Sequence, residues 1–311
     1  MTKVFIDGSS GTTGLQIRER LAQRSDLTIL TLPEAQRKDP AARADAMNDA
    51  DVVFLCLPDA AAVEAAGFVT NPATCVIDTS TAHRVDPGWV YGFAELGKRA
   101  EIAAAKRIAN PGCHATGFIS TVYPLLAAGA LDPGALLNCF SLTGYSGGGK
   151  SMIAEYEAPE RDGALDSPGI YALGQSHKHI PEITAVCGLK NAPVFCPIVD
   201  DYFKGMATTV PLHLALFHGV KTLRQLRELY ADFYAGQKFI QVADDAESAA
   251  YGKLYGNTKA GRDSLEIIVA GNDERCTVTA LFDNLGKGAS GAAIQNMNLA
   301  LGIDPAAGLV L

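Results

Sequence analysis

The chain opens with a short apolar strand that runs directly into a glycine-rich turn, and this junction constrains the fold more than any other segment. The strand covers residues 3–7, and the turn has glycine at positions 8, 11 and 14. Gly14, Ile17 and Leu21 then share one face of an expected helix. A strand, a glycine turn and a helix in this order are typical of a dinucleotide-binding fold, in which the pyrophosphate lies against backbone N–H groups at the helix N-terminus.

Apolar strands and helices alternate from this junction to residue 113. Nearly continuous apolar strands separated by helices predict a parallel sheet that is covered on both faces. After about residue 130 the expected strands are longer and more alternating, with few helices between them. The sequence therefore predicts an α/β fold, with a Rossmann-type dinucleotide-binding domain followed by a second α+β domain that has a mixed or antiparallel sheet. The expected strands are residues 27–32, 51–57, 74–78 and 107–109, then 136–143, 194–199, 206–216, 265–270 and 277–282, before a closing helix at 291–301.

Composition excludes several classes of function. The 311 residues carry a formal net charge of −8, so no basic patch argues for nucleic acid. No apolar run approaches the ~20 residues of a membrane span. The first strand begins at residue 3, which leaves no room for a signal peptide, and we expect a cytoplasmic protein. The seven cysteines include no C-x-x-C pair and are expected to be reduced thiols rather than disulfides or zinc ligands.

Basic residues after the second strand favour NADP over NAD. No acidic residue ends that strand, where an NAD enzyme holds the ribose hydroxyls, and Arg37 and Lys38 follow instead. Both can also be solvated surface residues, and a glycine-rich turn can be only a turn. The residues assigned to NADP(H) are Gly8, Ser10, Gly11, Thr12, Thr13, Gly14, Arg37, Lys38, Pro58 and Ser80.

A single cysteine follows the turn Asn110-Pro111-Gly112, just before a helix expected over residues 116–128. Peptide N–H groups at a helix N-terminus stabilise a thiolate, so Cys113 is a candidate nucleophile. The alternative is a buried structural thiol.

Two histidines and a carboxylate lie close together in His177-Lys178-His179-Ile180-Pro181-Glu182. Histidines two residues apart share a face only on a strand, and no third ligand is obvious, so no metal site is expected. The segment is more simply explained if one of these histidines acts as a general acid or base beside a thiolate.

The segment Gly144–Ser151 fits the Walker A pattern G-x-x-x-x-G-K-S. However, no apolar strand ending in Asp follows at a suitable distance, and the loop falls inside the second domain. Nucleotide phosphotransfer therefore remains a lesser alternative. The backbone N–H groups of such a loop still suit the phosphate of an acyl phosphate substrate. The residues assigned to that role are Ser146, Gly147, Gly148, Gly149 and Lys150.

These segments together resemble the N-acetyl-gamma-glutamyl-phosphate reductases, in their short form. Asn110–Cys113 is similar to the family's N-P-G-C-Y-P-T segment, and His177–Ile183 to its H-R-H-x-P-E-I segment. Ser146–Lys150 is similar to its S-G-A-G-R loop, and the resemblance extends to the C-terminal helix region. The chain departs from the family pattern at His114 and Ala115, where Tyr and Pro are usual, and at Thr12, where Tyr is usual.

The resemblance implies NADPH-dependent reduction of N-acetyl-gamma-glutamyl phosphate to N-acetylglutamate semialdehyde, a step of arginine biosynthesis, through a Cys113 thioester. It implies that His179 handles the proton with Glu182 orienting it, and that His177 and Tyr171 contact substrate. The spacing alone does not separate the two histidines. The family architecture implies a cofactor domain of residues 1–113 and 286–311, a catalytic and oligomerisation domain of residues 114–285, and a homodimer or homotetramer.

Three alternatives remain from the sequence. An aspartate-semialdehyde dehydrogenase runs the same chemistry on a shorter acyl phosphate, but its cysteine turn lacks the preceding Pro-Gly. A cysteine acyltransferase or hydrolase would use Cys113 and His179 without a dinucleotide. A non-catalytic NADP-binding regulator would not need Cys113.

Overall fold

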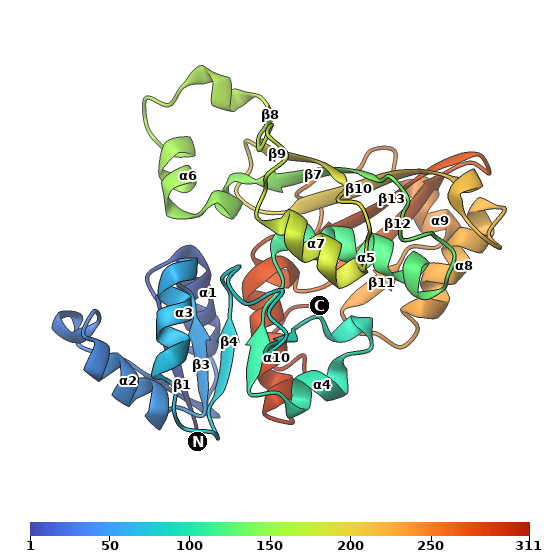
Figure 1. Ribbon diagram of the computed structural model, residues 1–311. Helices are drawn as coiled ribbons and strands as arrows, with labels where there is room; N and C mark the ends of the chain where they lie inside the picture. Colours follow the sequence, from blue (N-terminus) through green and yellow to red (C-terminus); the bar gives the residue numbers. More distant parts are fainter. The chain divides into compact units, whose positions relative to one another are not determined.

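The computed structural model describes residues 1–311 and divides into two compact units. The first unit comprises Met1–Gly112 and Ala289–Val310, and the second comprises Cys113–Gly288 with Leu311. Figure 1 labels the helices and strands of both. No helix is both long enough and apolar enough to cross a membrane.

The first unit is built on a six-stranded sheet in which every pairing is parallel, as the sequence predicts. The strand order is β2-β1-β3-β4-β6-β5. All residues of β3 and β4 are buried, because these strands lie in the middle of the sheet with helices on both faces. The strands are β1 (Thr2–Asp7), β2 (Leu27–Leu30), β3 (Val52–Leu55), β4 (Cys75–Asp78), β5 (Val90–Tyr91) and β6 (Arg107–Ala109).

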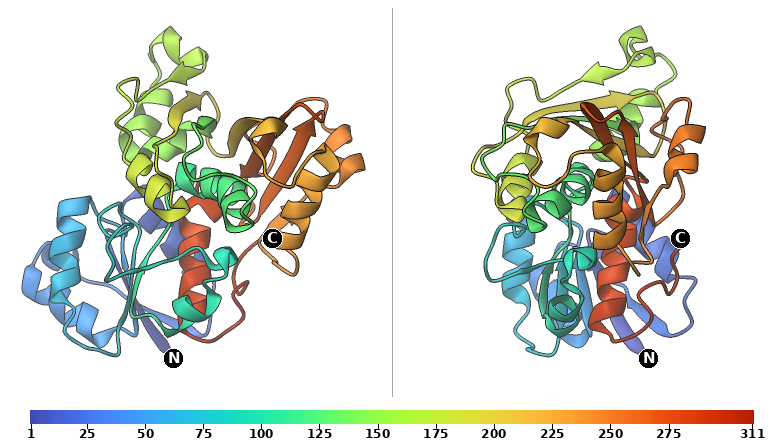
Figure 2. Two further views of the ribbon diagram at one scale, coloured as in Figure 1. Left: turned by 45° about the vertical axis from the view of Figure 1, so that its right-hand side comes forward. Right: turned by 90° about the vertical axis from the view of Figure 1, so that its right-hand side faces the viewer.

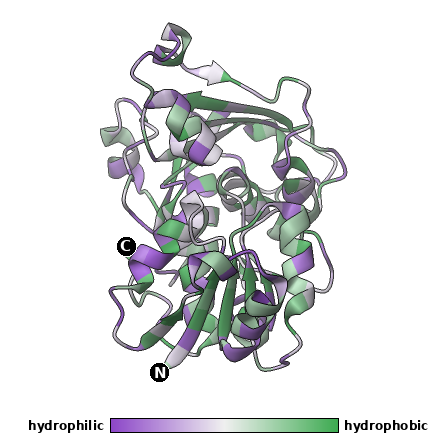
Figure 3. Ribbon diagram, turned by 90° about the vertical axis from the view of Figure 1, so that its left-hand side faces the viewer, coloured by the Kyte–Doolittle hydropathy of each residue, from purple (hydrophilic) through white to green (hydrophobic).

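Five helices cover this sheet in two separate cores. The helices are α1 (Thr12–Leu21), α2 (Pro40–Asp49), α3 (Asp59–Phe68), α4 (Arg99–Ala104) and α10 (Gly291–Ala300). One core joins α1, α4 and α10 to the sheet, and the other joins α2 and α3 to it. Figure 2 shows α10 beside α4, although these helices are far apart in the sequence. The strands of this sheet are mostly hydrophobic in Figure 3.

The second unit is built on a seven-stranded mixed sheet with the order β11-β12-β13-β10-β7-β9-β8. The pairs β7·β9 and β11·β12 are parallel, and the other pairs are antiparallel, which confirms the mixed sheet. The strands are β7 (Asn138–Gly144), β8 (Gly169–Ile170), β9 (Val194–Asp200), β10 (Met206–His213), β11 (Ile240–Val242), β12 (Leu265–Gly271) and β13 (Arg275–Phe282).

The expectation of few helices after residue 130 is wrong. After α5 (Cys113–Ala127) come α6 (Gly149–Tyr156), α7 (His179–Cys187), α8 (Leu223–Phe233) and α9 (Asp245–Ala250). Two of them carry a capping box, formed by Thr222 with Gln225 and by Asp244 with Glu247, which is a helix-start signal readable in the sequence. Helix α5 packs on β10, β13 and α7.

Candidate active site

Two glycines of the first turn are required by close backbone approach. Gly8 has φ +83°, and a Cβ there would lie 2.2 Å from the carbonyl oxygen of Cys56. A Cβ at Gly14 would lie 2.4 Å from the carbonyl oxygen of Gly8. The turn therefore folds tightly at the end of β1 only because these residues have no side chain.

The start of α1 has the features of an anion site. Gly11 is its N-cap and offers no side-chain cap, so the first-turn N–H groups at Thr12, Thr13 and Gly14 have no partner within the helix. The Thr12 hydroxyl is buried and makes no hydrogen bond. Donors that are held in place without an acceptor fit the pyrophosphate of a dinucleotide. Ser10, next to this turn, is exposed and lines the adjoining pocket.

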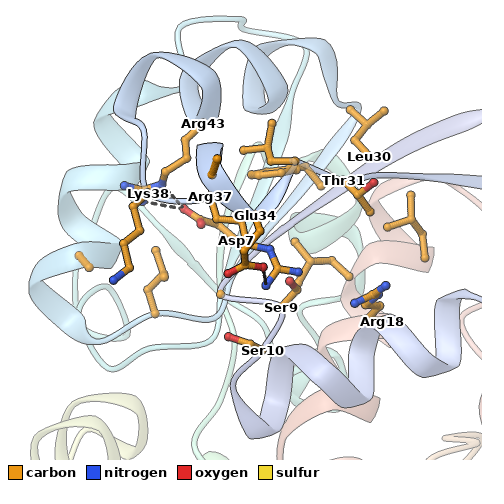
Figure 4. A pocket seen from close by; sticks show the side chains of 18 residues that line it. Asp7, Ser9, Ser10, Arg18, Leu30, Thr31, Glu34, Arg37, Lys38 and Arg43 are labelled. Carbon is orange, nitrogen blue, oxygen red and sulfur yellow. Dashed lines mark hydrogen bonds and ion pairs between the residues drawn. The ribbon is translucent and has the colours of Figure 1, made fainter.

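A pocket of about 430 Å³ opens beside this turn, and both predicted basic residues, Arg37 and Lys38, line it (Figure 4). The sequence reasoning missed four charged residues of the same pocket, Asp7, Arg18, Glu34 and Arg43. Glu34 lies 2.8 Å from Arg37 and pairs with it. The pocket therefore has four basic side chains, and two of them, Arg37 and Arg43, already have an acidic partner.

Asp7, at the end of β1, is held by a buried pair that the sequence did not reveal. Arg43 donates to the Asp7 carboxylate from Nε at 3.1 Å and from Nη2 at 2.7 Å. Asp7 therefore anchors helix α2, and it also lines the pocket.

Two residues assigned to the cofactor, Pro58 and Ser80, do not line this pocket. Pro58 is the exposed N-cap of α3 and does not line the pocket, although the adjacent Leu57 does. Ser80 donates its hydroxyl to Asp78 at 2.7 Å, so its side chain serves the loop after β4.

Cys113 is the first residue of α5, which begins three residues earlier than residue 116. Its sulfur is therefore at the helix end whose dipole and free N–H groups favour a thiolate. The preceding Asn110 is fixed within the first unit by three contacts. Arg84 donates to its carbonyl oxygen at 3.0 Å, Asn296 donates to its side-chain oxygen at 3.0 Å, and its own amide donates to Ala289 at 3.1 Å.

The residue after Cys113, His114, is buried at the centre of a polar cluster. Its Nδ1 lies 2.7 Å from the Ser141 hydroxyl, and its Nε2 lies 2.7 Å from the Tyr171 hydroxyl. Burial, followed by the electrostatic effects of His177 and Lys178, lowers the pKa of His114 to about 3, so the ring of His114 is neutral. No sequence pattern indicates these contacts of His114, because Ser141 and Tyr171 are distant from it in the chain.

The two histidines of the predicted segment lie beside that ring. The His177 ring centroid is 5.4 Å and the His179 ring centroid 5.7 Å from that of His114. His179 is the first residue of α7, and its backbone N–H donates to Nδ1 of His177 at 3.2 Å. Glu182 lies one turn further along α7 and is 2% exposed. The structure thus gathers Cys113, both histidines and Tyr171 in one unit.

Tyr171 is held in place by its own segment. Its backbone N–H donates to Pro197 at 3.1 Å, and the side chain of Gln175 exchanges two hydrogen bonds of 2.9 Å with the backbone of Phe195. Ala172 and Gln175 have φ of 51° and 54°, a region that non-glycine residues seldom adopt. Burial raises the pKa of Tyr171, and the negative charge of the Cys113 thiolate raises it further. The hydroxyl therefore lies within the field of the nucleophile.

The Walker-like segment does not form a phosphate-wrapping loop. The N–H groups of Gly144, Tyr145 and Ser146 donate to backbone carbonyls of residues 202–205. Ser146 is buried and accepts from Asn284 at 2.9 Å. Gly147, Gly148 and Lys150 are exposed, and Gly149 begins α6.

The structure holds no group of three or more His, Cys, Asp or Glu side chains placed to bind a metal ion.

Comparisons with known proteins cover almost the whole chain. Residues 3–105 match a family described as semialdehyde dehydrogenase, NAD binding domain, and residues 113–284 match one described as semialdehyde dehydrogenase, dimerisation domain. N-acetyl-gamma-glutamyl-phosphate reductases of Rhizobium johnstonii and Burkholderia cenocepacia are each 46% identical, covering 96% and 98% of this chain and 98% of theirs. N-acetyl-gamma-glutamyl-phosphate reductase 2 of Pseudomonas putida is 46% identical over 96% of both chains.

Solved structures share the fold at low identity. Aspartate semialdehyde dehydrogenase II of Vibrio cholerae, complexed with ASA, has a TM-score of 0.72 at 16% identity, covering 97% of this chain and 98% of that one. Aspartate semialdehyde dehydrogenase of Candida albicans with NADP has a TM-score of 0.64 at 15% identity, covering 96% and 99%.

Proposed function

We propose, since the chain belongs to the family of N-acetyl-gamma-glutamyl-phosphate reductases, that it reduces N-acetyl-gamma-glutamyl phosphate to N-acetyl-L-glutamate 5-semialdehyde with NADPH. This is a step of arginine biosynthesis. The observation that carries the proposal is the placement of Cys113 at the N-terminus of α5, beside a cluster that contains three histidines and a tyrosine.

The residues of the second unit account for the covalent chemistry. The Cys113 thiolate attacks the acyl carbonyl carbon, the C–O bond to phosphate breaks, and a thioester remains. Hydride addition gives a thiohemiacetal, whose C–S bond then breaks to release the aldehyde and the thiolate. Both tetrahedral species carry an oxyanion, and backbone N–H donors at the start of α5 stabilise it by roughly 3 kcal/mol each.

The two histidines take different roles. Because Nδ1 of His177 accepts the His179 N–H, the neutral His177 ring carries its proton on Nε2 and can donate but not accept there. His177 therefore suits binding of a substrate oxygen. We assign proton handling to His179 and its orientation to Glu182, which is buried on the same helix.

The first unit holds the cofactor, and the second unit is the catalytic and oligomerisation domain. The glycine turn, the start of α1 and the pocket with Arg37 and Lys38 fit the pyrophosphate and the 2′-phosphate. When bound, NADPH supplies the hydride. We assign the substrate phosphate to the exposed residues around Gly147–Lys150, where Ser146 fixes the start of the segment. A cytoplasmic location follows from the supply of NADPH and a short-lived acyl phosphate within the cell.

The open face of the second sheet is the contact between copies in a homodimer, or in a homotetramer built from such dimers. Pairing registers place Phe140, Ile170 and Val194 on the face opposite Ser141 and Cys139, and they are 44%, 57% and 51% exposed. Exposed apolar side chains gathered on one sheet face are typical of an interaction surface. The match to a dimerisation domain supports the same conclusion.

The test is the reverse reaction, phosphate-dependent reduction of NADP with N-acetylglutamate semialdehyde. Wild-type enzyme should turn over, and Cys113→Ser should fold and bind NADP but lose at least ~10³-fold in kcat, because an alkoxide forms poorly at neutral pH. Aspartate semialdehyde serves as the alternative substrate. A higher kcat/KM with aspartate semialdehyde would assign the protein as an aspartate-semialdehyde dehydrogenase instead. Cys113→Ser activity within tenfold of wild type would remove Cys113 from the mechanism.

A further inference from the structure

The hydroxyl of Tyr171 is the end of a chain of four hydrogen-bonding side chains that runs into the core of the second unit. Tyr171 contacts Nε2 of His114, Nδ1 of His114 contacts Ser141, and Ser141 contacts Thr208. The three distances are 2.7, 2.7 and 2.8 Å, all within the range of good hydrogen bonds. Sequence analysis singled out His114 only as a departure from the usual tyrosine, and the mechanism above does not use it.

The number of hydrogens on these four side chains limits which group can donate in each of the three hydrogen bonds. With His114 neutral, each of the four groups has one hydrogen to donate, and the chain contains three hydrogen bonds. One hydrogen is therefore left over, and it belongs to Thr208, to Ser141 or to Tyr171.

Burial decides among these three groups. Thr208 and Ser141 are both 0% exposed, and Ser141 is the hydrogen-bond partner of the Thr208 hydroxyl. If Thr208 accepted from Ser141, or if Ser141 accepted from both Thr208 and His114, a hydroxyl hydrogen would be buried without an acceptor, at a cost of about 1–3 kcal/mol. Thr208 therefore donates to Ser141, Ser141 donates to Nδ1 of His114, and Nε2–H of His114 donates to the Tyr171 oxygen.

The Tyr171 O–H is then left to donate outside the chain. Tyr171 is only partly buried, and its segment is fixed by Pro197 and by Gln175. The ring of His114 also contacts the rings of His177 and Phe195, with centroids 5.4 Å away in each contact. Neither the ring nor the phenol can turn freely, so the direction of the O–H is set before substrate arrives.

We propose that His114 is a positioning residue which, with Ser141 behind it, holds the Tyr171 hydroxyl as a hydrogen-bond donor to the oxyanion formed on the Cys113-bound carbon. Tyr171 is thereby a catalytic residue that contacts the reacting oxygen, and not only a contact for substrate binding. His114 acts through it by fixing the donor direction. This inference rests on the proposed function, because it requires an acyl group on Cys113.

The experiment compares kcat and KM of five variants in the phosphate-dependent reduction of NADP. Tyr171→Phe should lower kcat by about 10²-fold or more, as expected for loss of one oxyanion donor. His114→Phe should lower kcat by about 10-fold or more with KM changed less than about threefold, because the donor acts mainly in the transition state. His114→Gln, whose amide can accept from Ser141 and donate to Tyr171, should recover most of that loss.

Two further variants test the direction of the chain. Ser141→Ala removes the donor to Nδ1 and should lower kcat several-fold, whereas Thr208→Val leaves Ser141 able to donate and should stay within about threefold of wild type. The control is Ser120→Ala, which removes another buried hydroxyl from α5, one that donates to Gly117 at 2.9 Å. It should match wild type.

The outcomes separate the two proposals. If wild-type enzyme does not turn over, the proposed function fails before the variants are compared. If wild type is active and Ser141→Ala and His114→Phe behave like Ser120→Ala, the positioning role of His114 is overturned while the proposed function stands. The positioning role of His114 is also overturned if the kcat of His114→Gln is no higher than that of His114→Phe, because the site then needs only the shape of the ring.

Discussion

Gly288 lies against Cys113 so closely that a Cβ at residue 288 would be 3.0 Å from the Cβ of the cysteine. The same Cβ would be 3.1 Å from the carbonyl oxygen of Asp283. Gly288 belongs to a single π-helical turn, Gly286–Ser290, a form that occurs most often at functional sites. The nucleophile is thus supported from the far end of the second unit's sequence.

Gly288→Ala should displace Cys113 by a few tenths of an ångström, because a contact of 3.0 Å is tighter than nine in ten real Cβ contacts. We expect kcat to fall by about tenfold, in proportion to the ~10²-fold cost of a 1 Å misplacement. Stability should fall by about 1–3 kcal/mol, as for other overpacked sites. Iodoacetamide alkylation of Cys113 and steady-state turnover measure the effect. Gly163→Ala, where nothing lies within 4 Å of the new Cβ, is the control. Unchanged alkylation and turnover in Gly288→Ala would contradict the prediction.

Arg37 and Lys38 should decide cofactor preference. The double change Arg37→Ala with Lys38→Ala should weaken NADP by about 1–3 kcal/mol, through loss of charge-assisted hydrogen bonds, and leave NAD nearly unaffected. Glu34→Gln should act in the opposite direction and tighten NADP, because Glu34 now pairs with Arg37 and would repel a 2′-phosphate. Fluorescence titration with both cofactors gives the affinities, and NAD is the internal control. Equal losses for NADP and NAD in the double variant would show that both side chains are only solvated surface.

His179→Asn and His177→Asn should separate kcat from KM. A proton-transfer residue contributes about 10²–10⁴ to the chemical step, so His179→Asn should lower kcat strongly. His177→Asn should chiefly raise KM, since the Nδ1 contact with the His179 N–H leaves only Nε2 to bind substrate. Steady-state kinetics with the semialdehyde and phosphate measure both. If His177→Asn is the kcat variant, the two roles must be exchanged.

Lys150→Ala should weaken binding of inorganic phosphate in the reverse reaction, seen as a higher KM for phosphate. Its side chain is exposed, so folding should not change. NADPH affinity should also be unchanged, because the cofactor site is assigned to the first unit. Lys190→Ala, an exposed lysine of the second unit, is the control. Tight binding or hydrolysis of ATP by wild type would instead support the Walker-like reading of this loop.

His114 should make the protein acid-sensitive. Its pKa falls from 6.5 in the unfolded chain to about 3 in the folded one, so between these values only the unfolded chain takes up a proton. Stability therefore falls as pH falls below 6.5, by about 1.4 kcal/mol per pH unit and about 2 kcal/mol at pH 5. Urea unfolding at pH 7 and pH 5 should show that His114→Gln loses about 2 kcal/mol less than wild type. The exposed His213→Gln is the control, and an unchanged pH dependence in His114→Gln would contradict the assignment.

The sequence predicted the first unit well because its signals are local. Buried strands such as β3 and β4 read as continuous apolar runs, and the glycine turn is a contiguous motif. The second unit was predicted less completely, since its helices are short and their capping boxes were overlooked. The polar cluster around His114 could not be predicted from the sequence. Its contacts join residues that are 27 and 57 positions away, and they depend on the pairing of strands. Asp7–Arg43 and Glu34–Arg37 were missed because charge pairs leave no periodic pattern.

Helix α10 completes a core begun at the opposite end of the chain, since Ile294 and Met297 pack with Val4 and Ile17. During synthesis, residues 113–288 must all be translated before α10 appears. At ~5–20 residues per second this delay is roughly 10–35 s, in which the early sheet carries an uncovered apolar face. If translation stops inside the second unit, the released fragment lacks α10, exposes the apolar face of the first sheet and is prone to aggregate. Holding by chaperones during translation, not only the stability of the final fold, will limit how much active enzyme a cell obtains.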